Sequence, residues 1–218
     1  MLQSSGSMKK QWTKNIFTWA LSLVMIGAGV ALVASFFFAS SLDGIATNSA
    51  DPGGFNVPKL APSNDSATGG PKDKTLKLTV PAMSQIRDDT VPTVPGTDMQ
   101  ALGTHAAIHL AGTGFPWDKE ANVYLAGHRL GYPRTDSFLA FFDLNKVQVG
   151  DQVYVTDANG TKYTYRVFKT FTVSPSDLSV TDPVAGKNIL TLQTCTLPDY
   201  SQRLIVQAEL VNTQPASS

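Results

Sequence analysis

The amino-acid sequence predicts an all-β barrel or sandwich that follows one membrane-spanning helix and a flexible stalk. Three observations support this fold class. Residues 16–39 form an almost wholly apolar run. Short alternating segments separated by glycine and proline follow from about residue 74 onward. Few segments are long and periodic enough for helices, which favours an all-β domain of ordinary size over residues 74–212.

The apolar run at residues 16–39 contains no charged residue. Because about 20 apolar residues span a hydrocarbon core as a helix, the run is long enough for a transmembrane anchor. Lys9, Lys10 and Lys14 precede it, and the positive-inside rule therefore places residues 1–15 in the cytoplasm as a short tail. A cleavable signal peptide is the alternative, but its apolar part is only roughly 7–15 residues long. A retained single-pass anchor is favoured, with everything after it outside the cell.

Residues 40–73 are rich in proline, glycine, asparagine, serine and aspartate. Such a composition buries too little apolar surface to offset the entropy of ordering, so a flexible extracellular linker is expected. Residues 213–218 are polar and are expected to form a short C-terminal tail.

Local patterns within residues 74–212 predict individual strands and turns. Residues 76–80 alternate between apolar and polar side chains and end at a proline. Asn159-Gly160 separates two alternating runs and suits a tight hairpin turn. Residues 137–144 are expected to form a helical turn whose aromatic side chains pack on the barrel.

Cys195 is the only cysteine in the chain, so it cannot form an internal disulfide. A lone cysteine usually packs as a small hydrophobe, and on the cysteine alone that interpretation is favoured. Its context favours a reactive thiol. In the strand predicted at residues 188–195, Leu190 and Leu192 share one face, and Cys195 lies on the opposite face with Gln193.

Arg203 begins the next predicted strand, residues 203–210, and also lies on the face opposite its most apolar side chains. Residues 196–202 contain proline, aspartate and serine, which favour a turn. We therefore expect an antiparallel hairpin that brings Cys195 and Arg203 together at its mouth.

Three histidines could assist a thiol. His128 ends an alternating segment, residues 122–128, and lies on the face opposite Val123 and Leu125. His105 and His109 lie in a stretch that is expected to be less ordered, where a surface or core role is favoured over a catalytic one. His128 is therefore the preferred partner of the thiol.

Three short motifs resemble the histidine, cysteine and arginine signature of the sortases, which are membrane-anchored cysteine transpeptidases of Gram-positive bacteria. The motifs are Ala126-Gly127-His128-Arg129, Thr191-Leu192-Gln193-Thr194-Cys195 and Arg203-Leu204-Ile205-Val206. The resemblance covers about residues 75–211, because the motifs occur in the right order with strand-like sequence between them. It implies an eight-stranded sortase-type β-barrel with short helices, and the flanks of His128 are similar to the actinobacterial class E group.

The resemblance also implies roles for individual residues. Cys195 matches the nucleophile, His128 the catalytic histidine and Arg203 the essential arginine. Thr194 is expected to pack and hydrogen-bond beside the nucleophile and to contribute to substrate binding. His109 is similar to a histidine with a supporting, substrate-binding role in some members.

The implied reaction is cleavage of a C-terminal LPxTG-like or LAxTG-like sorting signal after its threonine. The implied partners are secreted proteins that carry this signal, a cell-wall precursor amine and the membrane. A pilus-assembling sortase is one alternative; Asp51-Pro52-Gly53 lacks the aromatic residue of a pilus-type lid, and no second apolar span follows Val211. A non-catalytic, membrane-tethered peptide-binding β-domain is the other.

Composition argues against several further functions. The chain has 17 basic and 17 acidic side chains, so an electrostatic nucleic-acid surface is not expected. No Cys-x-x-Cys pair, histidine cluster or glycine-rich phosphate loop is present, so neither a metal nor a cofactor is expected. Scattered carboxylates are expected to be solvated surface charges rather than calcium ligands; they are Glu120, Asp177, Asp182 and Asp199.

Overall fold

A computed structural model describes residues 57–58 and 69–216 of the chain. The expected membrane span and most of the expected linker lie outside these residues. Within the described part, no helix is both long enough and apolar enough to cross a bilayer.

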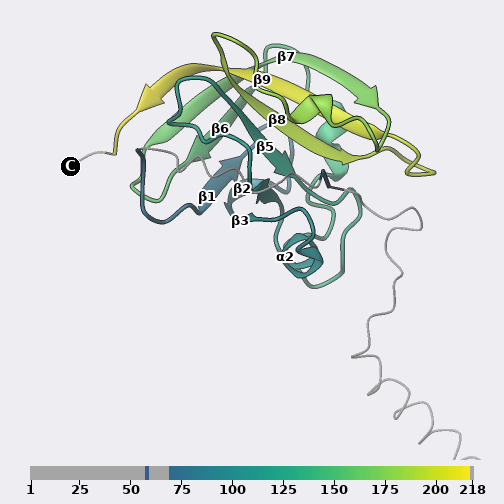
Figure 1. Ribbon diagram of the computed structural model, residues 1–218. Helices are drawn as coiled ribbons and strands as arrows, with labels where there is room; N and C mark the ends of the chain where they lie inside the picture. Colours follow the sequence, from purple (N-terminus) through teal and green to yellow (C-terminus); the bar gives the residue numbers. More distant parts are fainter. Residues whose placement is uncertain (1–56, 59–68, 217–218) are drawn as a thin grey trace, which may run out of the picture. The chain divides into compact units, whose positions relative to one another are not determined.

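The described residues form one nine-stranded sheet in the order β2-β1-β6-β7-β9-β8-β5-β4-β3 (Figure 1). The strands are β1 Leu76–Thr79, β2 Arg87–Val91, β3 Thr93–Val94, β4 Ile108–Leu110, β5 Ala121–Ala126, β6 Gln152–Thr156, β7 Lys162–Val173, β8 Asn188–Cys195 and β9 Arg203–Gln214. All neighbouring pairs are antiparallel except β3 with β4 and β5 with β8.

The two edge strands, β2 and β3, are separated in sequence only by Pro92, so both edges of the sheet meet and the barrel is nearly closed. The expected all-β barrel is confirmed. The described part contains nine strands rather than eight, because Pro92 cannot donate a ladder hydrogen bond and separates the two-residue β3 from β2.

Helical structure in the described residues is short, as expected. It comprises α2 Met99–Thr104 and two 3₁₀ turns, η1 Phe142–Lys146 and η2 Ser179–Thr181. The side chain of Asp98 caps α2 by accepting a hydrogen bond from the backbone N–H of Ala101 at 2.9 Å.

The predicted hairpin around Asn159-Gly160 joins β6 to β7. Its loop has five residues rather than a tight two-residue turn. The reason is Asp157, whose Oδ1 accepts hydrogen bonds from the N–H groups of Asn159 and Thr161, each at 2.9 Å. Gly160 supplies the left-handed conformation, with φ of 85°, that this loop requires.

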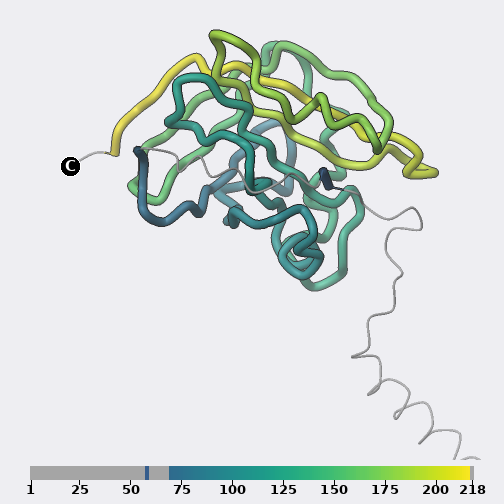
Figure 2. Tube along the Cα trace, viewed as in Figure 1, coloured from purple at the N-terminus to yellow at the C-terminus, as the bar shows by residue number. Residues whose placement is uncertain are grey.

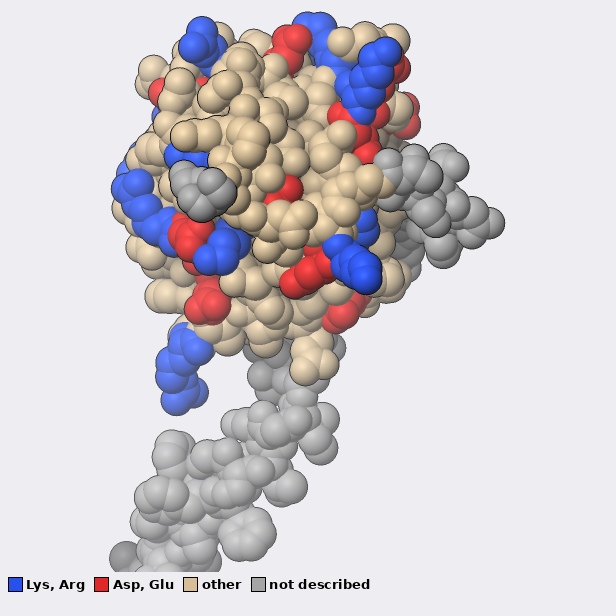
Figure 3. All heavy atoms as spheres, turned by 90° about the vertical axis from the view of Figure 1, so that its left-hand side faces the viewer, with Lys and Arg blue, Asp and Glu red and all other residues tan. Residues whose placement is uncertain are grey.

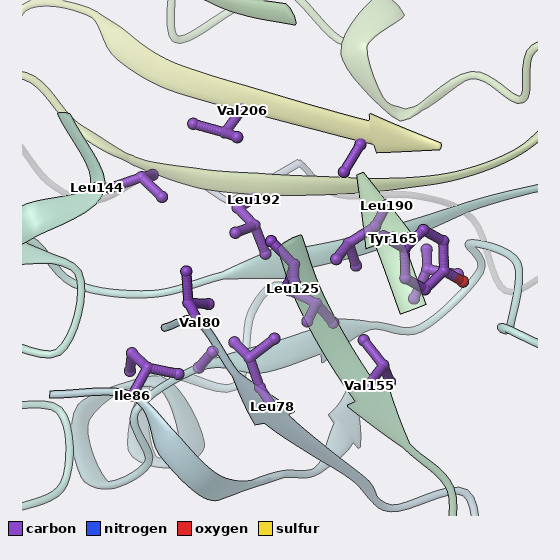
Figure 4. Close-up of a cluster of buried hydrophobic side chains, with 14 of the residues drawn as sticks. Leu78, Val80, Ile86, Leu125, Leu144, Val155, Tyr165, Leu190, Leu192 and Val206 are labelled. Carbon is purple, nitrogen blue, oxygen red and sulfur yellow. The ribbon is translucent and has the colours of Figure 1, made fainter. Parts of the chain in front are cut away.

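The main core fills the interior of the barrel, where side chains from β1, β5, β6, β8 and β9 point toward one another (Figure 4). Leu190 and Leu192 lie in it, as the alternation of β8 predicts. Phe141 closes the core from the predicted helical turn, whereas Phe138 and Phe142 are exposed.

A second buried cluster lies on the opposite face of β8 and β9, and we call it the outer cluster. Cys195 of β8 and Ile205 of β9 belong to it, together with side chains from β4, β5, α2 and η2. Its remaining buried members are Val57, Leu102, Ile108, Leu110, Tyr124, Ala126, Val180 and Tyr200. The traces of β8 and β9 run side by side (Figure 2).

Two residues of the expected linker, Val57 and Pro58, are buried in the structure. Val57 packs in the outer cluster. A Cβ atom on Gly96 would lie 2.5 Å from the carbonyl oxygen of Pro58 and 3.0 Å from Cγ1 of Val57, so this pair fits closely against a glycine. At the other end of the domain, β9 continues to Gln214, two residues into the expected tail.

Charges of both signs are interspersed on the face shown in Figure 3. Two of the ion pairs among the described residues, Lys77–Asp88 and Lys187–Glu209, are solvent-exposed and therefore contribute little to stability.

Candidate active site

Cys195 is the last residue of β8 and Arg203 is the first residue of β9, and the two are direct cross-strand partners. The predicted antiparallel hairpin and its mouth are therefore confirmed. The intervening turn is closed by hydrogen bonds from the N–H of Thr196 to the carbonyl of Gln202 and from the N–H of Tyr200 to the carbonyl of Thr196. Both Cys195 and Arg203 are almost fully buried, at 1% and 2% exposure.

The guanidinium of Arg203 is held by the backbone of this turn. Its Nη1 donates to the carbonyl oxygens of Tyr200 at 3.1 Å and Gln202 at 3.2 Å. These two backbone acceptors help to fix the orientation of the planar guanidinium.

His128 lies two residues beyond the end of β5, and the parallel pairing of β5 with β8 places it next to the cysteine strand. The pairing continues past the strand end through Gly127, whose N–H donates to the carbonyl of Gln193 at 3.1 Å. Thr194 Oγ1 donates to the carbonyl oxygen of Gly127 at 2.8 Å. These two bonds position the backbone at His128 beside the end of β8.

The atoms packed around Gly127 leave no room for a side chain at this position. A Cβ atom there would lie 2.6 Å from the carbonyl oxygen of Ala106 and 2.9 Å from Cδ1 of Phe141. The His128 ring also packs against the Tyr132 ring, with the ring centres 5.5 Å apart and the ring planes at 90°. The histidine is 1% exposed.

Arg129 adds a second guanidinium near the thiol. Its Nη2 donates to Oδ1 of Asn145 at 2.8 Å, and its Cζ lies 5.7 Å from the centre of the Phe142 ring. Burial lowers the pKa of Arg129, while the negative charges of Asp143 and of ionised Cys195 oppose that shift. The position of Arg129 directly after His128 in the Ala126-Gly127-His128-Arg129 motif is the only sequence indication of a role for it.

Two further polar residues share the buried face with Cys195. Gln193 lies two positions before it on β8, and the Tyr124 hydroxyl donates to Oε1 of Gln193. Burial raises the pKa of Tyr124 well above its ordinary value, so the phenol stays protonated and can donate. The alternation of β8 indicated the orientation of Gln193, but nothing local indicated Tyr124 as its partner.

The expectation that His109 lies in a less ordered stretch is wrong, because it is the central residue of β4 and fully buried. Its Nε2 donates to the Gly114 carbonyl at 3.0 Å, its Nδ1 lies 3.0 Å from Thr93 Oγ1, and its ring packs on Phe115 at 4.6 Å. Burial lowers its pKa to about 4. None of these contacts involves the Cys195 hairpin, and a substrate-binding role for His109 stays a prediction.

His105 directly follows α2, where its Nδ1 lies 3.1 Å from the Ala101 carbonyl oxygen.

Of the residues predicted for the site, the structure brings together Cys195, Arg203, Thr194 and His128. Among the described residues, no three histidine, cysteine or acidic side chains are placed to hold a metal ion.

A family model described as the sortase domain matches residues 78–211. The chain belongs to the sortase family. Sortase A of Streptococcus agalactiae is 38% identical over 92 residues, which are 42% of this chain and 37% of that protein. Sortase A of Listeria monocytogenes is 34% identical over 129 residues, 56% of this chain and 55% of that protein. This sortase-family chain thus spans between about a third and about half of the length of these curated relatives.

Solved sortase structures share the fold. Pilus island 1 sortase C2 of Group B Streptococcus is 31% identical, with a TM-score of 0.54 over 63% of this chain and 73% of that chain. Sortase E from Streptomyces avermitilis is 30% identical, with a TM-score of 0.52 over 66% of this chain and 91% of that chain.

Proposed function

We propose that this chain is a cysteine transpeptidase that cleaves a C-terminal LPxTG-like or LAxTG-like sorting signal after its threonine and joins the protein to a cell-wall precursor amine. One observation carries the proposal. Cys195 faces Arg203 across the hairpin, and His128 is held beside the same strand by the Gly127 hydrogen bonds. A nucleophile, a proton carrier and an oxyanion donor are the groups that acyl transfer requires.

In the first half of the reaction, the Cys195 thiolate attacks the threonine carbonyl and forms a C–S bond. The C–N bond to the next residue breaks, and His128 gives its proton to the departing amine. Arg203 donates to the oxygen on which negative charge develops, or orients the peptide backbone beside it. The product is a thioester between the threonine and Cys195.

In the second half, an incoming amine attacks this thioester. His128 removes the proton of that amine, the new C–N bond forms, and Cys195 leaves as a thiolate. The partners are secreted proteins with a sorting signal and a cell-wall precursor amine. The apolar span at residues 16–39 would anchor the enzyme in the membrane with residues 1–15 in the cytoplasm and the catalytic domain outside.

The activity is tested with full-length protein in detergent and peptides that contain Leu-Pro-x-Thr-Gly or Leu-Ala-x-Thr-Gly. We expect cleavage between threonine and glycine, and a peptide adduct on Cys195 by mass spectrometry. Cys195→Ala should bind peptide without cleaving it. Peptide binding by the parent protein with neither cleavage nor adduct would identify a non-catalytic peptide-binding domain.

A pilus-assembling role is the second candidate, because the fold is similar to a pilus island sortase at 31% identity. The two roles use different acceptors. Offering a cell-wall-type peptide amine and a lysine-containing protein subunit to the same thioester distinguishes them, since the preferred acceptor consumes the adduct faster.

The topology has its own test. Protease added to intact cells that lack a wall should cut within residues 40–73 and release the domain. Full protection of this segment would contradict an extracellular domain.

A further inference from the structure

The side chain of Gln193 lies on the buried face of β8 that also carries Cys195. It is 2% exposed, and its cross-strand partner on β9 is Ile205, a member of the outer cluster. Two residues along a strand correspond to about 6.6 Å, so the amide lies within two peptide positions of the reacting sulfur.

Only one end of the Gln193 amide is used within the described part of the chain. Oε1 accepts the hydrogen bond from the Tyr124 hydroxyl, whereas the buried Nε2 has no hydrogen-bond partner among these residues. Leaving a buried N–H donor unsatisfied is costly, and an aliphatic side chain at this position would avoid the cost. The buried Nε2 donor of Gln193 would be satisfied if a bound molecule supplied a hydrogen-bond acceptor.

The hydrogen bond from Tyr124 determines which end of the Gln193 amide has no hydrogen-bond partner among the described residues. Its hydroxyl is buried and stays protonated, so it donates to the amide oxygen and directs the NH₂ end away from itself. Tyr124 and Val57 belong to the same outer cluster as Cys195, and Val57 comes from a segment far from β8 in sequence. Side chains from segments far apart in sequence therefore pack on the face of β8 that carries the thiol.

We infer that Gln193 is a positioning residue whose Nε2 donates a hydrogen bond to a main-chain carbonyl of the bound sorting peptide, within two residues of the reacting threonine. The inference rests on the proposed transpeptidase function. It assigns Tyr124 the task of holding the Gln193 amide in the donating orientation. A main-chain acceptor is common to every peptide, so Gln193 contributes affinity and register rather than choice between proline and alanine in the signal.

The test compares Gln193→Leu with the parent full-length protein. Cleavage of a Leu-Pro-x-Thr-Gly peptide should show KM raised about tenfold with kcat changed much less, because one hydrogen bond to the bound peptide is lost. The melting temperature should stay level or rise, since the unsatisfied donor is removed. A merely structural Gln193 would instead lower the melting temperature and leave KM unchanged.

Three further measurements keep the inference separate from the proposed function. In the Cys195→Ala background, Gln193→Leu should weaken binding of a fluorescent Leu-Pro-x-Thr-Gly peptide about tenfold, independently of turnover. Gln193→Glu, which keeps the acceptor for Tyr124 but loses the donor, should bind as poorly as Gln193→Leu. Tyr124→Phe should weaken binding in the parent but have no further effect in Gln193→Leu.

Normal peptide affinity in Gln193→Leu, with normal cleavage by the parent, would overturn this inference alone. Failure of the parent protein to bind or cleave any sorting peptide would overturn the proposed function and this inference with it.

Discussion

The hydroxyl of Thr194 donates a 2.8 Å hydrogen bond to the carbonyl oxygen of Gly127, across 67 residues of sequence. It joins the residue before the proposed nucleophile to the residue before the proposed catalytic histidine. Because both ends of this bond are buried, it is not weakened by competition with water.

Removing this link should impair both stability and turnover. Thr194→Val keeps the shape of the side chain but leaves the Gly127 carbonyl without its hydroxyl donor, which should cost about 1–3 kcal/mol in the free energy of unfolding. We also expect kcat to fall, because one of the two hydrogen bonds that position the backbone at His128 beside β8 is lost. Denaturant unfolding and peptide cleavage measure the two effects. Thr194→Ser is the matched control, and equal behaviour of the valine and serine variants would contradict the role.

Arg203→Lys should lose transpeptidation by about 10²–10³-fold, the loss typical of removing one oxyanion donor. Lysine keeps the charge, but it cannot donate to the Tyr200 and Gln202 carbonyls and to a substrate oxygen with the geometry of a planar guanidinium. Turnover and melting temperature are measured on the same preparation. Near-normal turnover with unchanged melting would show that Arg203 is not catalytic.

His128→Ala should remove turnover, whereas His105→Ala should retain most of it. His128 is fixed beside β8, while the described hydrogen bonds of His105 are made to the end of its own helix. Steady-state cleavage by the two purified variants is the measurement. A reversed order of the two effects would show that the histidine assignment is wrong.

His109 should make stability depend on pH. Its folded pKa of about 4 lies below the ordinary value of 6.5, so the unfolded chain binds a proton between these values that the folded chain does not. The free energy of unfolding should therefore be highest above about pH 6.5 and fall as the pH drops toward 4, by on the order of 3 kcal/mol. Urea unfolding across this range measures the slope. His109→Gln should be less stable at neutral pH but should lack this part of the slope.

Val57→Asp should make Cys195 more accessible. Val57 is 4% exposed in the outer cluster, and a carboxylate there would lack a partner, so the segment should leave this surface. Alkylation of Cys195 by iodoacetamide should become faster. Val149→Asp, at a position 68% exposed, is the control and should leave the rate unchanged. Identical labelling rates for both variants would show that Val57 does not shield the thiol.

Several features could be read from local sequence because their cause is local. Side chains alternate along any strand, so the orientations of Leu190, Leu192 and Cys195 followed from the residue order alone. The turns after Cys195 and around Asn159-Gly160 have the residue types that such turns require, and both hairpins are present. The loop after β6 is longer than predicted because the Asp157 side chain hydrogen-bonds to two backbone N–H groups within it.

The amino-acid sequence by itself determined the β class, the apolar run at residues 16–39 and the pairing of Cys195 with Arg203 across a short turn. Only the tertiary structure decided that β5 lies parallel to β8, that His109 is a buried core residue, and that Tyr124 orients Gln193. The physical reason is the range of the interactions. A strand's faces and a hairpin's turn depend on neighbouring residues, whereas a parallel strand pair and a buried polar contact depend on segments that meet only when the whole barrel packs.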